Sequence, residues 1–160
     1  SVTPALVFSQ LLKNNQPQAA AWVTGNTSAP QLSGLVKFYD TPYGGVLIES
    51  ELFGLPNIQT SGSSDFYAMH IHENGDCSQS FTKTGEHYNP QHRLHPYHAG
   101  DLLPVLGNQG YAWEAFYDKR FSISDILGRS VVIHSDSDDF SSQPSGNSGN
   151  KIGCGMIRRV

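Results

Sequence analysis

The sequence has few cysteines and few positive charges. Only two of its 160 residues are cysteine, Cys77 and Cys154, and they form no Cys-x-x-Cys pair. Iron–sulfur clusters are therefore excluded, because they need several clustered thiolates. Ten basic residues are outnumbered by fourteen acidic ones, which gives a net charge of −4 and a pI of about 5.9. We expect no nucleic-acid partner and no membrane partner, because nucleic acids and acidic membrane surfaces both select basic patches.

Long hydrophobic runs are also missing. No apolar stretch approaches the roughly 20 residues that cross a bilayer, and no leader pattern opens the chain, so a cytoplasmic location stays open. The two cysteines favour an extracytoplasmic location, secreted or in the cell envelope. We expect them to form a structural disulfide, with two free buried thiols as the alternative, and disulfides persist in oxidising compartments.

Turn-forming residues, in contrast, are abundant. Sixteen glycines and nine prolines separate short runs rich in Val, Ile, Tyr, Phe and Trp. This pattern is typical of many short strands joined by turns, and the length suits one domain. The sequence therefore predicts an all-β fold, a sandwich or flattened barrel, in a single domain over residues 1–160.

Eight runs are strand candidates, and one run is a helix candidate. The strand candidates are 19–25, 34–41, 45–53, 66–72, 111–117, 120–124, 129–134 and 152–157. In the N-terminal extension, residues 1–17, Thr3 and Pro4 precede an apolar stripe, which predicts a short helix that covers one end of the β domain. A remnant of a leader is the alternative for this segment. Between 73 and 110 we expect a long functional loop without strands.

Six of the seven histidines fall at spacings that can bring them together. His70 and His72 alternate along a strand, so their side chains point to the same face. The others, with one carboxylate, are His87, His95, His98, Asp101 and His134. A lone histidine is as often solvated as ligating, but a group of six favours a metal site. Three imidazoles and a carboxylate from the long loop suit zinc, and an all-nitrogen set with His70, His72 and His134 suits copper.

The segments around these residues resemble copper/zinc superoxide dismutases. The resemblance covers about residues 19–157 and runs through Met69–Cys77, Gly85–Pro90, His95–Leu102, Gly128–His134, Gly146–Gly149 and Cys154–Gly155. It implies an eight-stranded Greek-key β-sandwich or flattened barrel. It also implies that the protein converts superoxide to oxygen and hydrogen peroxide by copper redox cycling, with zinc in a structural role.

Carried over residue by residue, the resemblance implies two ligand sets that share one histidine. Copper would be bound by His70, His72, His87 and His134, and zinc by His87, His95, His98 and Asp101. His87 would be the catalytic bridging imidazolate. The resemblance also implies that Cys77 pairs with Cys154 and that Asp138 joins His70 to His95, which fixes both rings.

The chain departs from the family pattern at the expected anion-binding position. Lys151 stands where most members place an arginine above the copper. Lysine keeps the charge but lacks the planar fork that binds an anion with two donors. The segment 135–151 is also shorter than in the familiar eukaryotic enzymes and is rich in aspartate. We therefore expect a slower enzyme; the alternative is a related copper/zinc-binding protein with little or no turnover.

The last residues bear on the oligomeric state. Arg158 and Arg159 stand where dimeric eukaryotic members place small and apolar residues in their subunit contact. With the short metal and electrostatic loops, this favours a bacterial-like member. A homodimer of the eukaryotic type is not expected, and a monomer or another type of dimer remains open.

Overall fold

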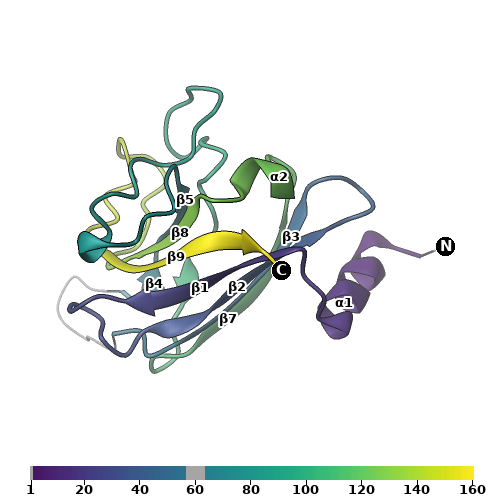
Figure 1. Ribbon diagram of the computed structural model, residues 1–160, viewed down its shortest axis with the longest axis horizontal. Helices are drawn as coiled ribbons and strands as arrows, with labels where there is room; N and C mark the ends of the chain where they lie inside the picture. Colours follow the sequence, from purple (N-terminus) through teal and green to yellow (C-terminus); the bar gives the residue numbers. More distant parts are fainter. Residues whose placement is uncertain (1, 57–63) are drawn as a thin grey trace.

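The computed structural model describes residues 2–56 and 64–160, and its main element is one curled antiparallel sheet (Figure 1). This sheet has seven strands in the order β5-β8-β9-β1-β2-β3-β7, and β4 and β6 form a second, two-stranded sheet. The strands are β1 (Ala19–Gly25), β2 (Ser33–Asp40), β3 (Val46–Phe53), β4 (Phe66–Tyr67), β5 (Met69–His72), β6 (Val105–Leu106), β7 (Ala112–Asp118), β8 (Ser130–His134) and β9 (Lys151–Arg159). The predicted all-β class is confirmed.

The core lies inside the curl of the sheet. Side chains alternate between the two faces of each strand, so every second residue points inward. Val36, Phe38, Ile48, Ile71 and Ile133 are all fully buried there. Burying a side chain of this size stabilises the fold by about 1.5–3 kcal/mol, so this shared core makes a rigid support for loops attached to it.

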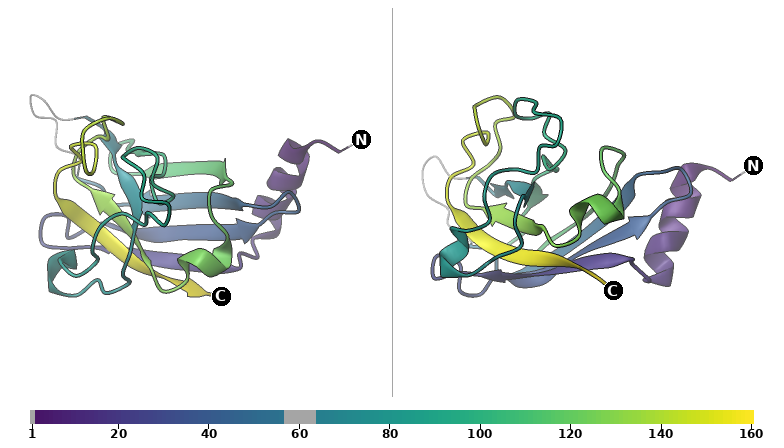
Figure 2. Two further views of the ribbon diagram at one scale, coloured as in Figure 1. Left: turned by 90° about the horizontal axis from the view of Figure 1, so that it is seen from above. Right: turned by 45° about the horizontal axis from the view of Figure 1, so that its top comes forward.

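The predicted N-terminal helix is confirmed as α1 (Pro4–Asn14), and it covers one end of the sheet. Thr3 caps it, since its hydroxyl accepts a hydrogen bond from the Leu6 backbone N–H, and Pro4 occupies the first turn. Phe8 stacks on Tyr117 and packs edge-on against Tyr43, with ring centroids 5.0 and 5.8 Å apart. The helix and the long loops lie at opposite ends of the molecule (Figure 2).

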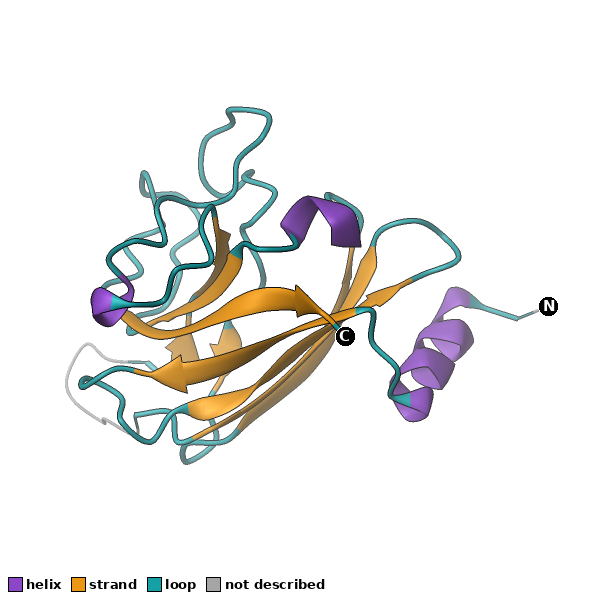
Figure 3. Cartoon of the chain, in the orientation of Figure 1, coloured by secondary structure: helices purple, strands orange, loops and turns teal. Residues whose placement is uncertain are grey.

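Three expectations about local structure were wrong. The strand expected at 66–72 is divided into β4, in the two-stranded sheet, and β5, in the seven-stranded sheet. The strand expected at 120–124 is absent: β7 ends at Asp118, and the helix α2 (Ile123–Ile126) follows (Figure 3). Ser122 and Asp125 form a reciprocal capping box, which stabilises the first turn of a helix rather than a strand. The segment 73–110 is also not free of strands, because β6 within it pairs with β4. It contains in addition the short 3₁₀ helix η1 (Gln79–Phe81).

A disulfide joins the long loop to the last strand. Cys77, in the loop after β5, is bonded to Cys154 on β9, as the sequence predicts. The bond closes a loop of 77 residues, and the chain-entropy model assigns about 4 kcal/mol of stabilisation to a loop of this length. The start of the loop is therefore attached to the sheet at a second point. Among the described residues, no helix has the length and apolar character needed to cross a membrane.

Candidate metal centre

The histidine strand β5 is the base of the site. His70 and His72 lie on one face of it, while Ile71 between them is buried in the core on the other face. β5 pairs with β8, and His134 ends β8 at a register shift after Ile133. The shift turns His134 towards His72, and the two Nε2 atoms are 3.3 Å apart.

The long loop folds back along β5 and is fixed there by backbone hydrogen bonds. The Tyr88 N–H donates to the Ile71 carbonyl, and the Ile71 N–H donates to the Gly100 carbonyl, both at 2.8 Å. These bonds place His87 opposite His72 and Asp101 opposite His70. Ligand candidates that are far apart in the sequence are thus brought together by the backbone of a single strand.

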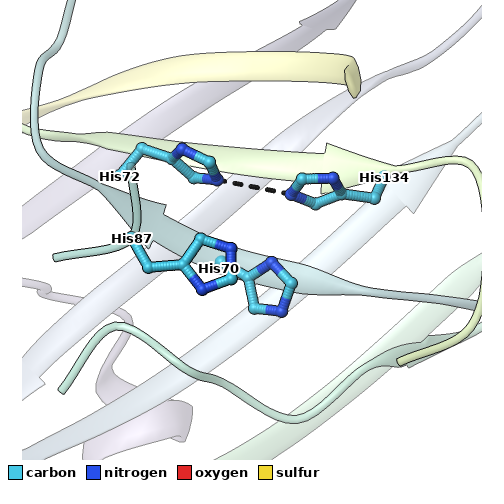
Figure 4. A group of neighbouring side chains, drawn as sticks. All are labelled: His70, His72, His87 and His134. Atoms are coloured by element: carbon cyan, nitrogen blue, oxygen red, sulfur yellow. Dashed lines mark hydrogen bonds between the residues drawn. The ribbon is translucent and has the colours of Figure 1, made fainter. Parts of the chain in front are cut away.

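Four histidines form an all-nitrogen cluster (Figure 4). One ring nitrogen from each lies within 4.8 Å of the others, and all four residues are buried: His70, His72, His87 and His134. The rings of His70 and His87 are close, with centroids 3.9 Å apart. This cluster matches the nitrogen-only donor set that suits copper.

A second cluster surrounds Asp101. Its Oδ1 lies 2.8 Å from His87 Nδ1 and 3.2 Å from His98 Nδ1, and its Oδ2 lies 3.0 Å from His95 Nδ1. One ligand atom from each of four residues also lies within 4.8 Å of the others in this cluster: His70, His87, His95 and Asp101. His98 belongs to the same cluster, since its Nδ1 is 3.2 Å from His87 Nδ1. Three imidazoles and a carboxylate at these distances fit a tetrahedral zinc site.

Hydrogen bonds to the outer nitrogens fix the orientation of the rings. The two carboxylate oxygens of Asp138 accept hydrogen bonds from His70 Nε2 and His95 Nε2, each 2.8 Å long. His72 Nδ1 donates to the Gly85 carbonyl at 2.9 Å. Each bond directs the lone pair of the other ring nitrogen inward, where it can bind a metal.

Several inner nitrogens lack a hydrogen-bond partner among the described residues. His70 Nδ1 and His87 Nε2 are buried and make no hydrogen bond there, and His95 Nδ1 lies 3.0 Å from Asp101 Oδ2 without a hydrogen bond of suitable geometry. An unsatisfied buried polar group costs about 1–3 kcal/mol, so a fold that keeps several together needs a compensating ligand. Copper and zinc bound by these nitrogens would provide it, and the donor set fits both.

The protonation states also suit metal binding. Burial, and then the neighbouring His87, lower the pKa of His134 to about 3, and the same causes hold the pKa of His70 and His72 well below 6.5. These rings are neutral at pH 7, which is the form that binds a metal. Burial alone would raise the pKa of Asp101, but the hydrogen bond and charge of His87 lower it overall, so the carboxylate is ionised.

A cavity of about 380 Å³ opens onto the histidines. Its lining includes His72, His87, His134 and Lys151. Lys151 lies on the wall, where its Nζ donates to the Thr84 hydroxyl at 2.7 Å and to the Gly85 and Phe81 carbonyls at 3.3 and 3.5 Å. Burial lowers the pKa of Lys151, and the charge of Lys151 lowers the pKa of His72 and His134 in turn.

The structure brings together every site residue expected from the sequence, in the two clusters, at Asp138 and on the cavity wall. Sequence reasoning missed Arg120, which donates to the backbone carbonyls of His98 and Asp101 and pairs with Asp118. It also set aside His92, which lines the same cavity. Neither residue lies in a motif that could have revealed it: the carbonyls that Arg120 binds are 19 and 22 residues away, and the place of His92 on the cavity depends on how the loop folds back.

Comparisons with known proteins agree on one family. Residues 32–157 match the family model described as copper/zinc superoxide dismutase (SODC). Superoxide dismutase [Cu-Zn] 3 of Arabidopsis thaliana is 33% identical over 156 residues, with 88% of this chain and 89% of the relative covered. Superoxide dismutase [Cu-Zn] of Legionella pneumophila is 34% identical over 162 residues, with 96% and 93% covered.

Two further similarities concern an extracellular relative and a solved structure. The extracellular superoxide dismutase [Cu-Zn] of Mus musculus is 34% identical over 137 residues, which cover 80% of this chain and 54% of the relative. The crystal structure of the clock protein EA4 superposes with a TM-score of 0.76 at 31% identity, covering 90% of this chain and 96% of that one.

Proposed function

Since this chain belongs to the copper/zinc superoxide dismutase family, we propose that it converts two superoxide ions and two protons to oxygen and hydrogen peroxide. The family uses copper and zinc, and the buried histidine clusters are able to bind both. Bound copper would supply the one-electron redox change. Bound zinc would favour loss of the proton from the other nitrogen of a shared imidazole.

The position of His87 between the two clusters is the observation that carries the proposal. Its Nδ1 lies 2.8 Å from Asp101 Oδ1, while its Nε2 is buried and has no hydrogen-bond partner within residues 2–56 and 64–160; His87 also belongs to the all-nitrogen cluster. One imidazole therefore offers one nitrogen to each set. We assign copper to His70, His72, His87 and His134, and zinc to His87, His95, His98 and Asp101. Because His87 also lines the cavity, its Nε2 can take up and release a proton beside the substrate.

Two other residues complete the site. Asp138 holds His70 and His95 in their tautomers from outside both clusters. Lys151 supplies positive potential at the cavity, which attracts an anion to a protein of net charge −4. Its three N–H donors are directed to Thr84, Gly85 and Phe81, so it acts through its charge rather than as a fork around the substrate.

That same engagement of Lys151 favours a second candidate function. A site without a free donor for the anion could bind copper and zinc with little or no turnover. The test is a superoxide-disappearance assay on reconstituted protein whose copper and zinc contents are measured in the same sample. We expect about one copper and one zinc per chain and a rate proportional to copper. Full metal content without catalysis would favour the metal-binding protein.

Location and assembly are part of the proposal. The Cys77–Cys154 disulfide and the extracellular relatives support an extracytoplasmic location. We retain a single domain over residues 1–160. The exposed Arg158 and Arg159 at the end of β9 argue against a dimer of the eukaryotic type, because apposed copies would bring like charges together.

A further inference from the structure

His92 is the one histidine of the seven that belongs to neither metal cluster, yet it lines the same cavity as His87 and His134. Its side chain is exposed, and within residues 2–56 and 64–160 its ring accepts and donates no hydrogen bond. A free imidazole therefore lies at the mouth of the metal centre.

The loop that carries His92 is held in a fixed shape. The Asn89 side chain binds both the N–H and the carbonyl of Arg93, each at 2.9 Å, and the His92 N–H donates to the Asn89 carbonyl at 3.3 Å. His92 itself has a φ of +54°, a left-handed conformation that favours glycine or asparagine. The Asn89 contacts thus hold the His92 imidazole at a fixed position on the cavity lining.

The charged side chains that line the cavity include one donor, on His92, that is free to bind an anion. Apart from the histidines of the metal clusters, Lys151 and His92 are the two lining side chains that can carry a positive charge, and Glu73 and Glu86 line the same cavity with the opposite sign. The N–H donors of Lys151 are already directed to the cavity wall. An incoming anion that must pass two carboxylates therefore finds its free donor on His92 rather than on Lys151.

We propose that the His92 imidazole hydrogen-bonds the incoming small monoanion at the cavity mouth, while Lys151 attracts that anion from the wall through its charge. The identification of the anion as superoxide rests on the proposed function. The binding role itself does not, because any small monoanion that reaches the copper position passes the same ring.

The experiment uses azide as the probe anion on full-length, copper- and zinc-loaded protein. Azide affinity is read from the change in the Cu(II) absorption band, and metal content and the superoxide rate are measured on the same samples. His92→Gly removes the ring without straining the backbone. His92→Asn also tolerates the positive φ and keeps an N–H donor. Gln91→Ala is the matched control, since Gln91 accepts a hydrogen bond from Arg93 and does not line this cavity.

We expect His92→Gly to weaken azide binding and slow superoxide loss about 3- to 10-fold, the range of one hydrogen bond, with unchanged copper and zinc. His92→Asn should recover much of the loss, and Gln91→Ala should match the wild type. Unchanged azide affinity in His92→Gly would overturn the proposal. Loss of metal from His92→Gly would also overturn it, because His92 would then be a metal ligand. Slower copper uptake with normal azide binding would overturn it too, because His92 would then act in metal delivery.

Azide binding also separates this proposal from the proposed function. If the fully loaded wild type shows no superoxide turnover, the proposed function fails, while the azide affinities of His92→Gly and His92→Asn still decide the role of His92.

Discussion

At the scale of single residues, the metal centre depends on which nitrogen of each histidine is already engaged. Asp138 occupies Nε2 of His70 and of His95, and the Gly85 carbonyl occupies Nδ1 of His72. The other nitrogen of each ring faces inward, and burial lowers the pKa of His70 and His72 so that these two rings are neutral. These hydrogen bonds determine which nitrogen of each ring is available to a metal.

Replacing the charge of Lys151 should slow the reaction without releasing metal. Lys151→Met keeps the length of the side chain but removes the positive potential, and we expect the superoxide rate to fall about tenfold, the low end of the range for electrostatic steering. Lys151→Arg should raise the rate, because a guanidinium group that hydrogen-bonds to the cavity wall still has N–H donors free to bind the anion. Both variants should keep their copper and zinc, since Nζ is not a ligand.

Lys83→Met, which removes an exposed lysine from the loop between β5 and β6, is the control for the loss of one charge. A Lys151→Met protein with the wild-type rate would show that this charge has no part in attracting the anion. Because burial lowers the pKa of Lys151, its charge is lost at a lower pH than that of an ordinary lysine. The wild-type rate should therefore decline on the alkaline side sooner than the rate of Lys151→Arg.

Glu114 on β7 makes stability depend on pH. Its Oε1 is buried without a partner among the described residues, and burial raises its pKa from 4.5 to about 8. Between these pH values the Glu114 carboxyl group is ionised in the unfolded chain but stays protonated in the folded protein. The free energy of unfolding therefore falls as the pH rises from about 4.5 to 8. Glu114→Gln should therefore stabilise the fold by about 1–2 kcal/mol at pH 8, after allowance for partial exposure, and by little at pH 4.

Denaturant unfolding at both pH values measures this effect. Asp40→Asn, which neutralises an exposed carboxylate at the end of β2, is the control and should change stability little at either pH. An equal effect of Glu114→Gln at pH 4 and pH 8 would contradict the link to ionisation.

At the scale of elements, Arg120 connects the turn after β7 to the loop that carries the zinc ligands. Its guanidinium donates to the carbonyls of His98, at 3.1 Å, and of Asp101, and is itself held by Asp118. Arg120→Ala should weaken zinc binding about 10-fold, as is typical when a group that orients ligands is lost. Copper affinity should change less, because the two ligand candidates that Arg120 contacts, His98 and Asp101, both belong to the zinc set.

Competition with a chromophoric chelator measures both metal affinities. Lys119→Ala removes the exposed cation next to Arg120 and is the matched control. Wild-type zinc affinity in Arg120→Ala would show that the disulfide and the backbone bonds to β5 position the segment without it.

The helices and strands also show which features of the fold can be predicted from the sequence. The alternation of His70, Ile71 and His72 predicts a shared face from local geometry alone, and the structure has it. The strand expected at 120–124 was wrong, because the capping pair Ser122 and Asp125 outweighs the β-forming residues around it. Contacts such as Lys151 with Thr84, 67 residues apart, depend on how the loops fold back on the sheet, and no local pattern encodes them.

At the scale of the whole molecule, metals and the disulfide attach the long loops to the curled sheet. The ligand candidates come from β5, from the end of β8 and from the loop between β5 and β6, so bound metals would join that loop to two strands of the sheet. Removing both metals with a chelator should lower the melting temperature by about 8–16 °C, the shift expected for a ligand present at a thousand times its dissociation constant.

Calorimetry of the same sample before and after chelation measures this shift. Copper and zinc should restore the melting temperature, and magnesium should not, because it prefers oxygen ligands in octahedral geometry. An unchanged melting temperature after complete metal removal would mean that the loops are ordered without the metals.

The most direct test is a diffraction experiment on copper- and zinc-loaded protein, with anomalous data collected on both sides of the copper and zinc absorption edges. We predict one copper peak among His70, His72, His87 and His134, one zinc peak among His87, His95, His98 and Asp101, and the His87 ring between them with a nitrogen directed at each metal. A structure of the loaded protein in which His87 contacts only one metal, or neither, would contradict the shared dinuclear centre.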